Sequence, residues 1–202
     1  MALVRSEGLI VDKHRQIYAK YDDETITVYQ AYSECIAVPA VQEGRFVMPF
    51  SMDRMTWIKP SFCWMMYRSG WAMKSGQEHV LAIRIKRSGF EWALRHACLS
   101  HFSSETYLSR DEWRARKRQS EVRVQWDPER DIHLNRLERR AIQVGLSGRA
   151  VELYVNDWIV EIENISDFVH EIAESRNESA LPVERLYPLD ADVLHIIGAK
   201  HS

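Results

Sequence analysis

The chain has 202 residues, of which 46% are hydrophobic and 28% are charged, and this composition excludes an intrinsically disordered protein. A chain of this length is typical of one domain and can bury a substantial core without disulfides or a structural metal. Lysine and arginine number 27 against 29 aspartate and glutamate, so the formal charge of -2 excludes a polyanion binder as a whole. A nucleic-acid surface would therefore have to be a local patch.

The first 25 residues are mixed and polar, and we expect them to form an extension that leads into the first strand. They lack the long apolar run of a signal peptide, and no stretch of the sequence approaches the roughly 20 apolar residues that cross a bilayer. We therefore expect a cytoplasmic protein that makes no membrane contact. The three cysteines, Cys35, Cys63 and Cys98, are an odd number without CxxC spacing, which predicts reduced and buried thiols.

Strand and helix signals alternate from residue 26 onward. Residues 26–32 (ITVYQAY) are rich in β-branched and aromatic residues, which predicts a strand. Ser33 can then cap a helix over residues 34–42 that stops at Gly44. Further elements are expected as a strand at 55–59, a helix over 62–71 capped by Ser61, a strand at 79–87, and an amphipathic helix over 89–102 that begins at Ser88.

The second half continues the mixed pattern. Residues 121–126 (EVRVQW) alternate as a strand does, and the Asp-Pro pair that follows predicts a turn over residues 127–131. Further elements are expected as an exposed helix or excursion over 105–119, strands at 140–146 and 158–162, a short helix over 148–155 and a helix over 165–175. We therefore predict an α/β (α+β) chain with an N-terminal extension (1–25), a single catalytic or binding domain (26–175) and a C-terminal arm (176–202).

The segment from Asp53 to Trp71 holds the densest mixture of charged and aromatic residues. Arg54, Lys59 and Arg68 lie among large apolar side chains, where a cation must be solvated, stacked or paired with an anion. A bound phosphate would be one such anion, and the helix N-terminus at Ser61 would add backbone donors for it. An ion pair with Asp53 or Glu91 is the competing explanation, which the sequence leaves open.

The same segment carries a family resemblance. The run RMTWIKPSFxWMMYRSGW, with TVYQAYS before it and VRVQWDPERD after it, resembles the signature of an uncharacterised bacterial and fungal family known only as a domain of unknown function. The resemblance covers residues from about 20 to 170, and Cys63 is a minor departure from the pattern. This resemblance implies membership of a family but does not imply a reaction.

The order of the elements also resembles that of ADP-ribosyltransferases of the diphtheria-toxin and DNA-modifying kinds. In those enzymes a first strand carries a Tyr-His-Gly/Ala-Thr/Ser sequence that holds nicotinamide, and the matching stretch here is Tyr29, Gln30, Ala31 and Tyr32. The resemblance implies a split, mostly antiparallel sheet flanked by helices, NAD as the substrate and no metal. The cofactor-binding residues that it implies are Gln30, Ala31, Tyr32, Trp57, Lys59, Ser61 and Tyr67.

The resemblance also implies residue roles in catalysis. Gln30 and Ala31 would position the nicotinamide ribose, Arg54 and Lys59 the diphosphate, and Tyr67 the nicotinamide ring. A catalytic Glu is expected on a late strand, where this chain has Gln143, which can orient an acceptor but cannot stabilise an oxocarbenium-like transition state. A carboxylate such as Asp127 or Glu129 could replace it, or the protein could bind NAD or ADP-ribose without turnover. The alternative reading is therefore a noncatalytic nucleotide or nucleic-acid binding module.

One run of basic residues could contact nucleic acid. It holds Arg110, Arg114, Arg116, Lys117 and Arg118, with Trp113 among them. If the domain acts on nucleic acid, these cations would hold the phosphate backbone while Trp113 stacks on a base. A solvated helix face is the alternative. His96 and His101 are five residues apart, which is not the spacing of a zinc-binding helix pair, so we expect no metal site.

Overall fold

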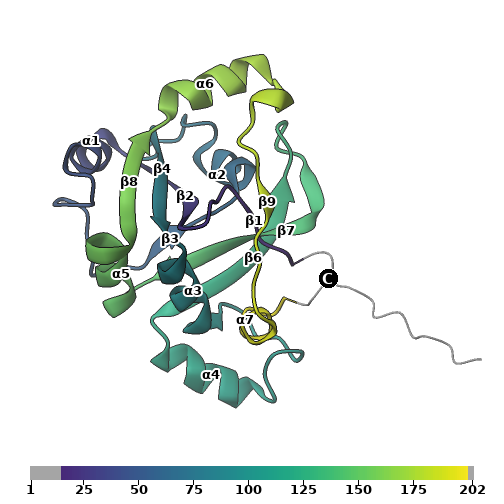
Figure 1. The fold of residues 1–202 in the computed structure, drawn as a ribbon. Helices are drawn as coiled ribbons and strands as arrows, with labels where there is room; N and C mark the ends of the chain where they lie inside the picture. The colour runs from purple at the N-terminus through teal and green to yellow at the C-terminus, as the bar shows by residue number, and fades with distance from the viewer. Residues whose placement is uncertain (1–14, 200–202) are drawn as a thin grey trace, which may run out of the picture.

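The computed structural model describes residues 15–199, which form an α+β fold with two larger sheets and one two-stranded pair (Figure 1). The strands are β1 (Tyr18–Ala19), β2 (Thr25–Tyr32), β3 (Thr56–Ile58), β4 (His79–Lys86), β5 (Ala97–Leu99), β6 (Val122–Arg130), β7 (Arg136–Leu146), β8 (Ile159–Asn164) and β9 (Arg185–Leu186). The helices are α1 (Glu34–Glu43), α2 (Phe62–Ser69), α3 (Arg87–Arg95), α4 (Arg110–Gln119), α5 (Arg149–Leu153), α6 (Ser166–Ser175) and α7 (Ala191–Ile196), with a π-helical turn at Tyr154–Trp158 and a 3-10 turn at Glu178–Ala180.

The sheet is split into two parts. Strands β2, β4 and β8 form an antiparallel sheet in that order, and β3, β7, β6 and β5 form a second sheet in which only β5 is parallel to its neighbour. The two sheets meet where the Tyr29 backbone N–H donates to the Lys59 carbonyl over 2.7 Å. The predicted class, an α+β domain with a split and mostly antiparallel sheet, is confirmed.

Strand β2 is buried on both faces over residues 25–30, although Thr25, Thr27 and Gln30 are polar. Ile26 and Val28 belong to the larger hydrophobic cluster, whereas Tyr29 belongs to a second cluster with Phe62 of α2 and Val169 of α6. The strand therefore separates two packed layers. The larger hydrophobic cluster lies on one side of β2, and the second cluster lies on the other side.

Helix α2 forms where the local signals placed it. Ser61 accepts a hydrogen bond from the Trp64 N–H and so caps the first turn, and Gly70 ends the helix in the left-handed conformation at φ 60°. Helix α1 likewise ends at Gly44 with φ 65°, although the side chain of Ser33 makes no capping hydrogen bond.

Two predicted elements are wrong. The helix predicted over residues 89–102 ends at Arg95, and Ala97–Leu99 pairs with β6 as the parallel strand β5. The turn predicted at 127–131 lies largely within β6, which continues to Arg130. Strand β7 pairs along one edge of β6, whereas β5 pairs along the other edge only at residues 122–124. The prolyl nitrogen of Pro128 faces this second edge, which has no partner strand at that position, so proline interrupts no hydrogen bond there.

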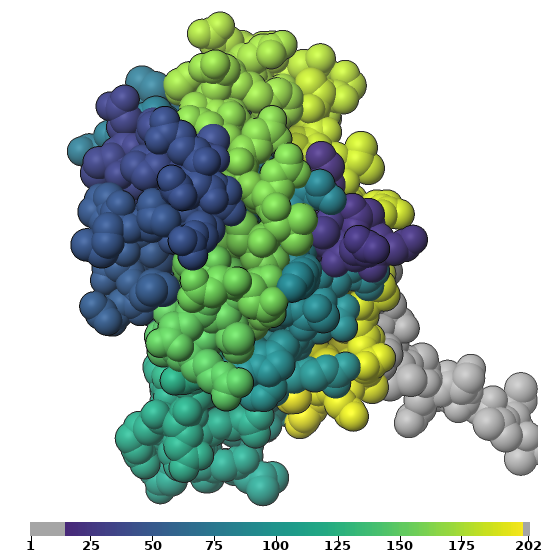
Figure 2. Space-filling view, turned by 60° about the vertical axis from the view of Figure 1, so that its left-hand side comes forward, coloured from purple at the N-terminus to yellow at the C-terminus, as the bar shows by residue number. Residues whose placement is uncertain are grey.

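The C-terminal segment from residue 176 packs against the rest of the described chain, and its Tyr187, Val193 and Ile197 belong to the larger hydrophobic cluster. Strand β9 pairs with β1, and the Trp126 indole N–H donates to the carbonyl of Ile197 over 2.7 Å. Figure 2 shows this segment in yellow beside the first described residues in purple.

The cysteine prediction needs one correction. Cys98 is buried, Cys63 is partly buried and Cys35 is exposed on α1, and all three are free thiols. Cys35 is exposed because it lies on the outer face of its helix, whereas Ala37 and Ala40 face the core. No helix within residues 15–199 combines the length and apolar character that a membrane span requires.

Candidate anion-binding site

A pocket of about 330 Å³ lies between β2, the chain around β3, and α2. We call it the three-cation pocket because Arg54, Lys59 and Arg68 line it and no aspartate or glutamate is among its described lining residues. The full lining is Gln30, Ala31, Tyr32, Ile36, Pro49, Phe50, Ser51, Arg54, Met55, Thr56, Trp57, Lys59, Met65, Arg68, Gly76 and Gln77.

Lys59 is the buried cation of this pocket. Only 8% of its surface is exposed, and Nζ donates a hydrogen bond of 2.9 Å to the carbonyl of Trp57. Burial, reinforced by the nearby positive charge of Arg68 and opposed by Asp127, lowers the pKa of Lys59 to about 7. Within residues 15–199 it forms no ion pair.

Arg54 and Arg68 are exposed, and neither forms an ion pair within the described part of the chain. Of the two acids that could have neutralised this cluster, Glu91 instead pairs with Arg87 at 3.8 Å and accepts a hydrogen bond from Tyr187. Asp53 is exposed and does not line the pocket. The structural ion pairs that the sequence left open are therefore not formed.

Gln30 organises the wall that β2 contributes. Its Nε2 donates to the hydroxyls of Tyr32 at 2.8 Å and Thr56 at 2.6 Å, and its Oε1 accepts from the buried Tyr154 hydroxyl at 2.7 Å. The amide is thus occupied by the protein, and a contact between Gln30 and a ribose would break one of these bonds. Tyr32 and Thr56 line the pocket together with Gln30, and sequence reasoning missed Thr56.

Trp57 is held in the pocket by a close backbone approach. It pairs with Gly145 of β7, and a Cβ at position 145 would lie 2.6 Å from Met55 Sδ and 3.1 Å from Trp57 Cε2. Only glycine leaves room for both side chains. The half-buried indole therefore forms part of the wall through a contact that the linear sequence does not reveal.

Ser61, at the N-terminus of α2, is not among the residues that line the three-cation pocket. The Ser61 hydroxyl donates to Glu129 over 2.9 Å, and the Phe62 N–H donates to Glu184 over 2.7 Å. Burial raises the pKa of Glu129, and it raises the pKa of the partly buried Glu184 to about 8, with Glu129 adding to the effect. Two carboxyl groups of the protein therefore occupy the place expected for a phosphate.

Tyr67 also lies outside the three-cation pocket. Its ring stacks on Trp64 with centroids 5.1 Å apart, and the Arg130 guanidinium lies 3.9 Å from its centroid. Because α2 turns this side chain away from Met65 and Arg68, the ring is used in packing. The expected stacking of Tyr67 on nicotinamide stays a prediction, and Tyr67 is not among the residues that line this pocket.

Asp127 and Gln143 lie side by side on β6 and β7 but do not line the pocket. Gln143 is buried and Asp127 is half-buried, and the Asp127 charge acts on Lys59. Of the predicted site residues, the structure brings six together in the pocket, namely Gln30, Ala31, Tyr32, Arg54, Trp57 and Lys59. It leaves four outside it, namely Ser61, Tyr67, Asp127 and Gln143.

The basic run forms helix α4, with Arg110, Arg114, Arg116 and Arg118 exposed. Trp113 packs on the core instead of facing solvent: its indole N–H donates to the Leu99 carbonyl at 2.8 Å, and Lys117 Nζ lies 4.7 Å from its ring centroid. Base stacking by Trp113 would require this packing to be lost. Arg114 pairs with Asp111 at 3.0 Å, and the Arg110 guanidinium lies 4.7 Å from the centroid of the Phe102 ring.

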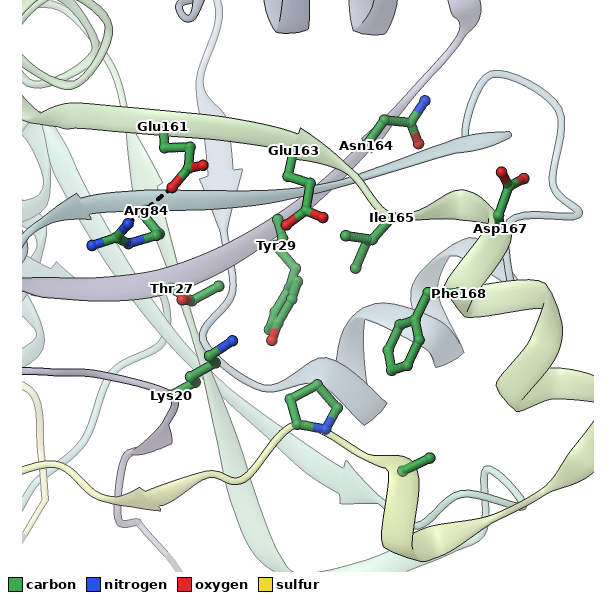
Figure 3. Close-up of a pocket in the computed structure, with 13 residues that line it drawn as sticks. Lys20, Thr27, Tyr29, Arg84, Glu161, Glu163, Asn164, Ile165, Asp167 and Phe168 are labelled. Carbon is green, nitrogen blue, oxygen red and sulfur yellow. Dashed lines mark hydrogen bonds and ion pairs between the residues drawn. The ribbon is translucent and has the colours of Figure 1, made fainter.

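A second cavity, of about 550 Å³, lies on the opposite face of β2 (Figure 3). Tyr29 points into it from β2, and Glu163 and Phe168 come from β8 and α6. Its charges are mixed, since Arg84 is already paired with Glu161 at 2.9 Å. Sequence reasoning missed this cavity because its walls come from segments far apart in the chain. No group of three metal-ligating side chains occurs within residues 15–199.

The sequence matches the model of one protein family over most of its length. The family model described as "Domain of unknown function (DUF4291)" matches residues 16–190. The chain belongs to this family. The DUF4291 match includes every residue that lines the three-cation pocket. A search of curated proteins gave no match.

Proposed function

We propose that the three-cation pocket binds the diphosphate of a nucleotide, with NAD as the first candidate, and that this DUF4291 chain is an ADP-ribosyltransferase-like protein. The acceptor would be a nucleic acid or a protein. One observation carries the proposal: a buried lysine and two arginines line an open pocket in which no described lining residue is acidic.

Electrostatics favours an anionic occupant. Removing an ammonium from water costs several kcal/mol unless a counter-charge is present, and within residues 15–199 the hydrogen-bond partner of Lys59 Nζ is a carbonyl. A diphosphate would supply that counter-charge, and the forked guanidinium groups of Arg54 and Arg68 suit its oxygens. A bound anion would also raise the pKa of Lys59 from its lowered value.

The other walls suit the rest of a nucleotide. The Trp57 indole offers a flat apolar surface for a base or a nicotinamide ring. The hydroxyls of Tyr32 and Thr56 can bind a ribose, while Gln30 acts behind them by fixing their positions. In this proposal the ribose contacts the hydroxyls of Tyr32 and Thr56, whereas the family resemblance implied a contact with Gln30.

Transfer of ADP-ribose would need a carboxylate near the reacting carbon. Asp127 is the candidate because its charge acts on Lys59 from β6, although β7 lies between β6 and β3 in the sheet. The neutral Gln143 beside it would orient the acceptor. The second candidate function, a noncatalytic nucleotide-binding module, is favoured by the position of Asp127 and Gln143 outside the pocket lining.

A thermal shift series with NAD, ADP-ribose and pyrophosphate tests the binding proposal. A ligand at a hundred times its dissociation constant stabilises the folded state by about 2.7 kcal/mol, which is easily measured. Arg54→Ala should abolish the shift, whereas Asp53→Ala, which changes an exposed neighbour outside the pocket, should keep it. If none of the three compounds shifts the melting temperature, the anion site is refuted.

Catalysis is tested separately from binding. NAD consumption and release of nicotinamide, measured with purified protein and candidate acceptors, should depend on Asp127 under the transferase proposal. A melting shift without NAD consumption favours the binding module. If Arg54→Ala unfolds the protein instead of only abolishing binding, Arg54 has a structural role.

A further inference from the structure

The three-cation pocket places its cations at different depths. Lys59 is nearly inaccessible, whereas the two arginines are exposed at the pocket mouth. A small ligand could therefore leave its phosphate with the arginines while another of its groups reaches the lysine amine. Among the described residues 15–199, Nζ has one hydrogen-bond partner, the Trp57 carbonyl, and no carboxylate forms an ion pair with it.

We propose that Lys59 Nζ forms an imine with the carbonyl carbon of a small phosphorylated aldehyde or ketone, whose phosphate is held by Arg54 and Arg68. The phosphate part rests on the anion site of the proposed function. The imine is a further activity, because ADP-ribosyl transfer does not require an amine nucleophile at this position.

The chemistry balances without an oxidant or a cofactor. The lone pair of the neutral amine forms a C–N bond, the π electrons of the carbonyl move to oxygen, and a proton passes from nitrogen to that oxygen. The resulting carbinolamine loses water and leaves the imine. One aldehyde or ketone and one amine thus give one imine and one water.

The wall of β2 supplies a donor for the carbonyl oxygen. The Tyr32 and Thr56 hydroxyls each accept from Gln30 and lie 3.0 Å apart, so one of their two hydrogens is used between them. Within residues 15–199 neither hydroxyl has another partner, which leaves one hydroxyl hydrogen free to point into the pocket.

In the pocket without a bound anion, the amine is also in the reactive protonation state. The charged and titratable groups around it come from four elements: Arg68 on α2, Arg54 before β3, Tyr32 on β2 and Asp127 on β6. Burial and Arg68 outweigh Asp127 and lower the pKa of Lys59 to about 7. At pH 8 most of the amine is then neutral, against less than about 1% for a lysine of ordinary pKa near 10.4.

Reductive trapping tests the proposal. The folded chain is incubated at neutral pH with glycolaldehyde phosphate or with glycolaldehyde, each with cyanoborohydride, and the modified lysines are located by peptide mass mapping. We expect Lys59 to be modified roughly tenfold faster than the exposed Lys74, and faster by the phosphorylated probe. Lys59→Arg should remove this labelling, whereas Lys74→Arg, at an exposed position outside the pocket lining, should leave both the labelling at Lys59 and the pyrophosphate-induced melting shift unchanged.

The outcomes separate this inference from the proposed function. A pyrophosphate shift without labelling at Lys59 overturns the imine and leaves the anion site standing. Labelling at Lys59 that is equal for both probes, with no pyrophosphate shift, overturns the phosphorylated substrate class and the anion site together. Labelling spread over exposed lysines but absent from Lys59 overturns the imine whatever pyrophosphate does.

Discussion

Gln143 Nε2 donates a hydrogen bond of 2.6 Å to Oδ2 of Asp127, across the paired strands β7 and β6. The other carboxylate oxygen of Asp127 accepts from Gln125 Nε2 at 2.9 Å. Two amides therefore hold one carboxylate, which gives a physical reason for a neutral residue at position 143. A glutamate there would meet Asp127 as a second negative charge.

We predict that Gln143→Glu destabilises the protein in a pH-dependent way. Two carboxylates this close repel each other when both are ionised, so the variant should lose about 1–3 kcal/mol of unfolding free energy near pH 8 and less near pH 5, where the pair can hold a proton. Urea denaturation at both pH values measures this difference. Gln143→Met removes the donor without adding a charge, and its loss should be similar at the two pH values. Equal losses for Gln143→Glu at both pH values would contradict the prediction.

Glu184 should make the unfolding free energy of the wild-type protein depend on pH, because burial of its carboxyl group favours the protonated form. Its pKa is raised by burial to about 8 from an ordinary 4.5, so between these values the folded state holds a proton that the unfolded state releases. The unfolding free energy should therefore fall as pH rises from about 5 to about 8.

Glu184→Gln should reduce this slope while keeping an oxygen to accept from the Phe62 N–H. A residual slope should remain because burial also raises the pKa of Glu129. Glu178→Gln, at an exposed position on the same arm, is the matched control and should leave the slope unchanged. A Glu184→Gln variant with the wild-type slope would show that the pH dependence arises elsewhere.

The fold was predictable where its signals are local. Helix α2 follows from Ser61 and Gly70, which cap it within a few residues of its ends. Strand β5 could not be found in this way, because Ala97–Leu99 becomes a strand only through pairing with β6, more than twenty residues later in the chain. The Asp-Pro pair led to a wrong turn prediction for a similar reason. Pro128 fits within β6 because β5 ends before this position and leaves that edge of β6 free, and the local sequence does not show where β5 ends.

The site was predictable in composition but not in geometry. The mixture of cations and aromatics indicated Arg54 and Lys59, and both line the pocket. The sequence could not reveal that Glu129 of β6 and Glu184, just before β9, approach the N-terminus of α2 and take the place expected for a phosphate. Long-range pairing decides which polar groups are already satisfied.

Gly145 tests how Trp57 is positioned. We predict that Gly145→Ala costs roughly 1–3 kcal/mol of unfolding free energy, because the new methyl group would overlap Met55 and crowd Trp57. The displaced indole should also weaken binding of NAD in the thermal shift assay. Met55→Ala in the Gly145→Ala background should recover part of the stability, since it removes the nearest obstructing atom. If the double variant is no more stable than Gly145→Ala, the overlap with Met55 is not the cause.

Lys59 should make nucleotide binding depend on pH. Its pKa of about 7 means that the amine is charged near pH 6 and mostly neutral near pH 8.5, whereas the diphosphate of NAD does not titrate in this range. Binding of the anion requires uptake of a proton at the higher pH, so we predict roughly a tenfold weaker affinity at pH 8.5 than at pH 6. Calorimetric titration in buffers of different ionisation enthalpy would measure both the affinity and the proton uptake. Lys59→Arg keeps its charge over the whole range and should bind with little change between the two values. A wild-type affinity that is constant with pH, or a Lys59→Arg variant with the wild-type slope, would mean that the amine of Lys59 does not contact the phosphates.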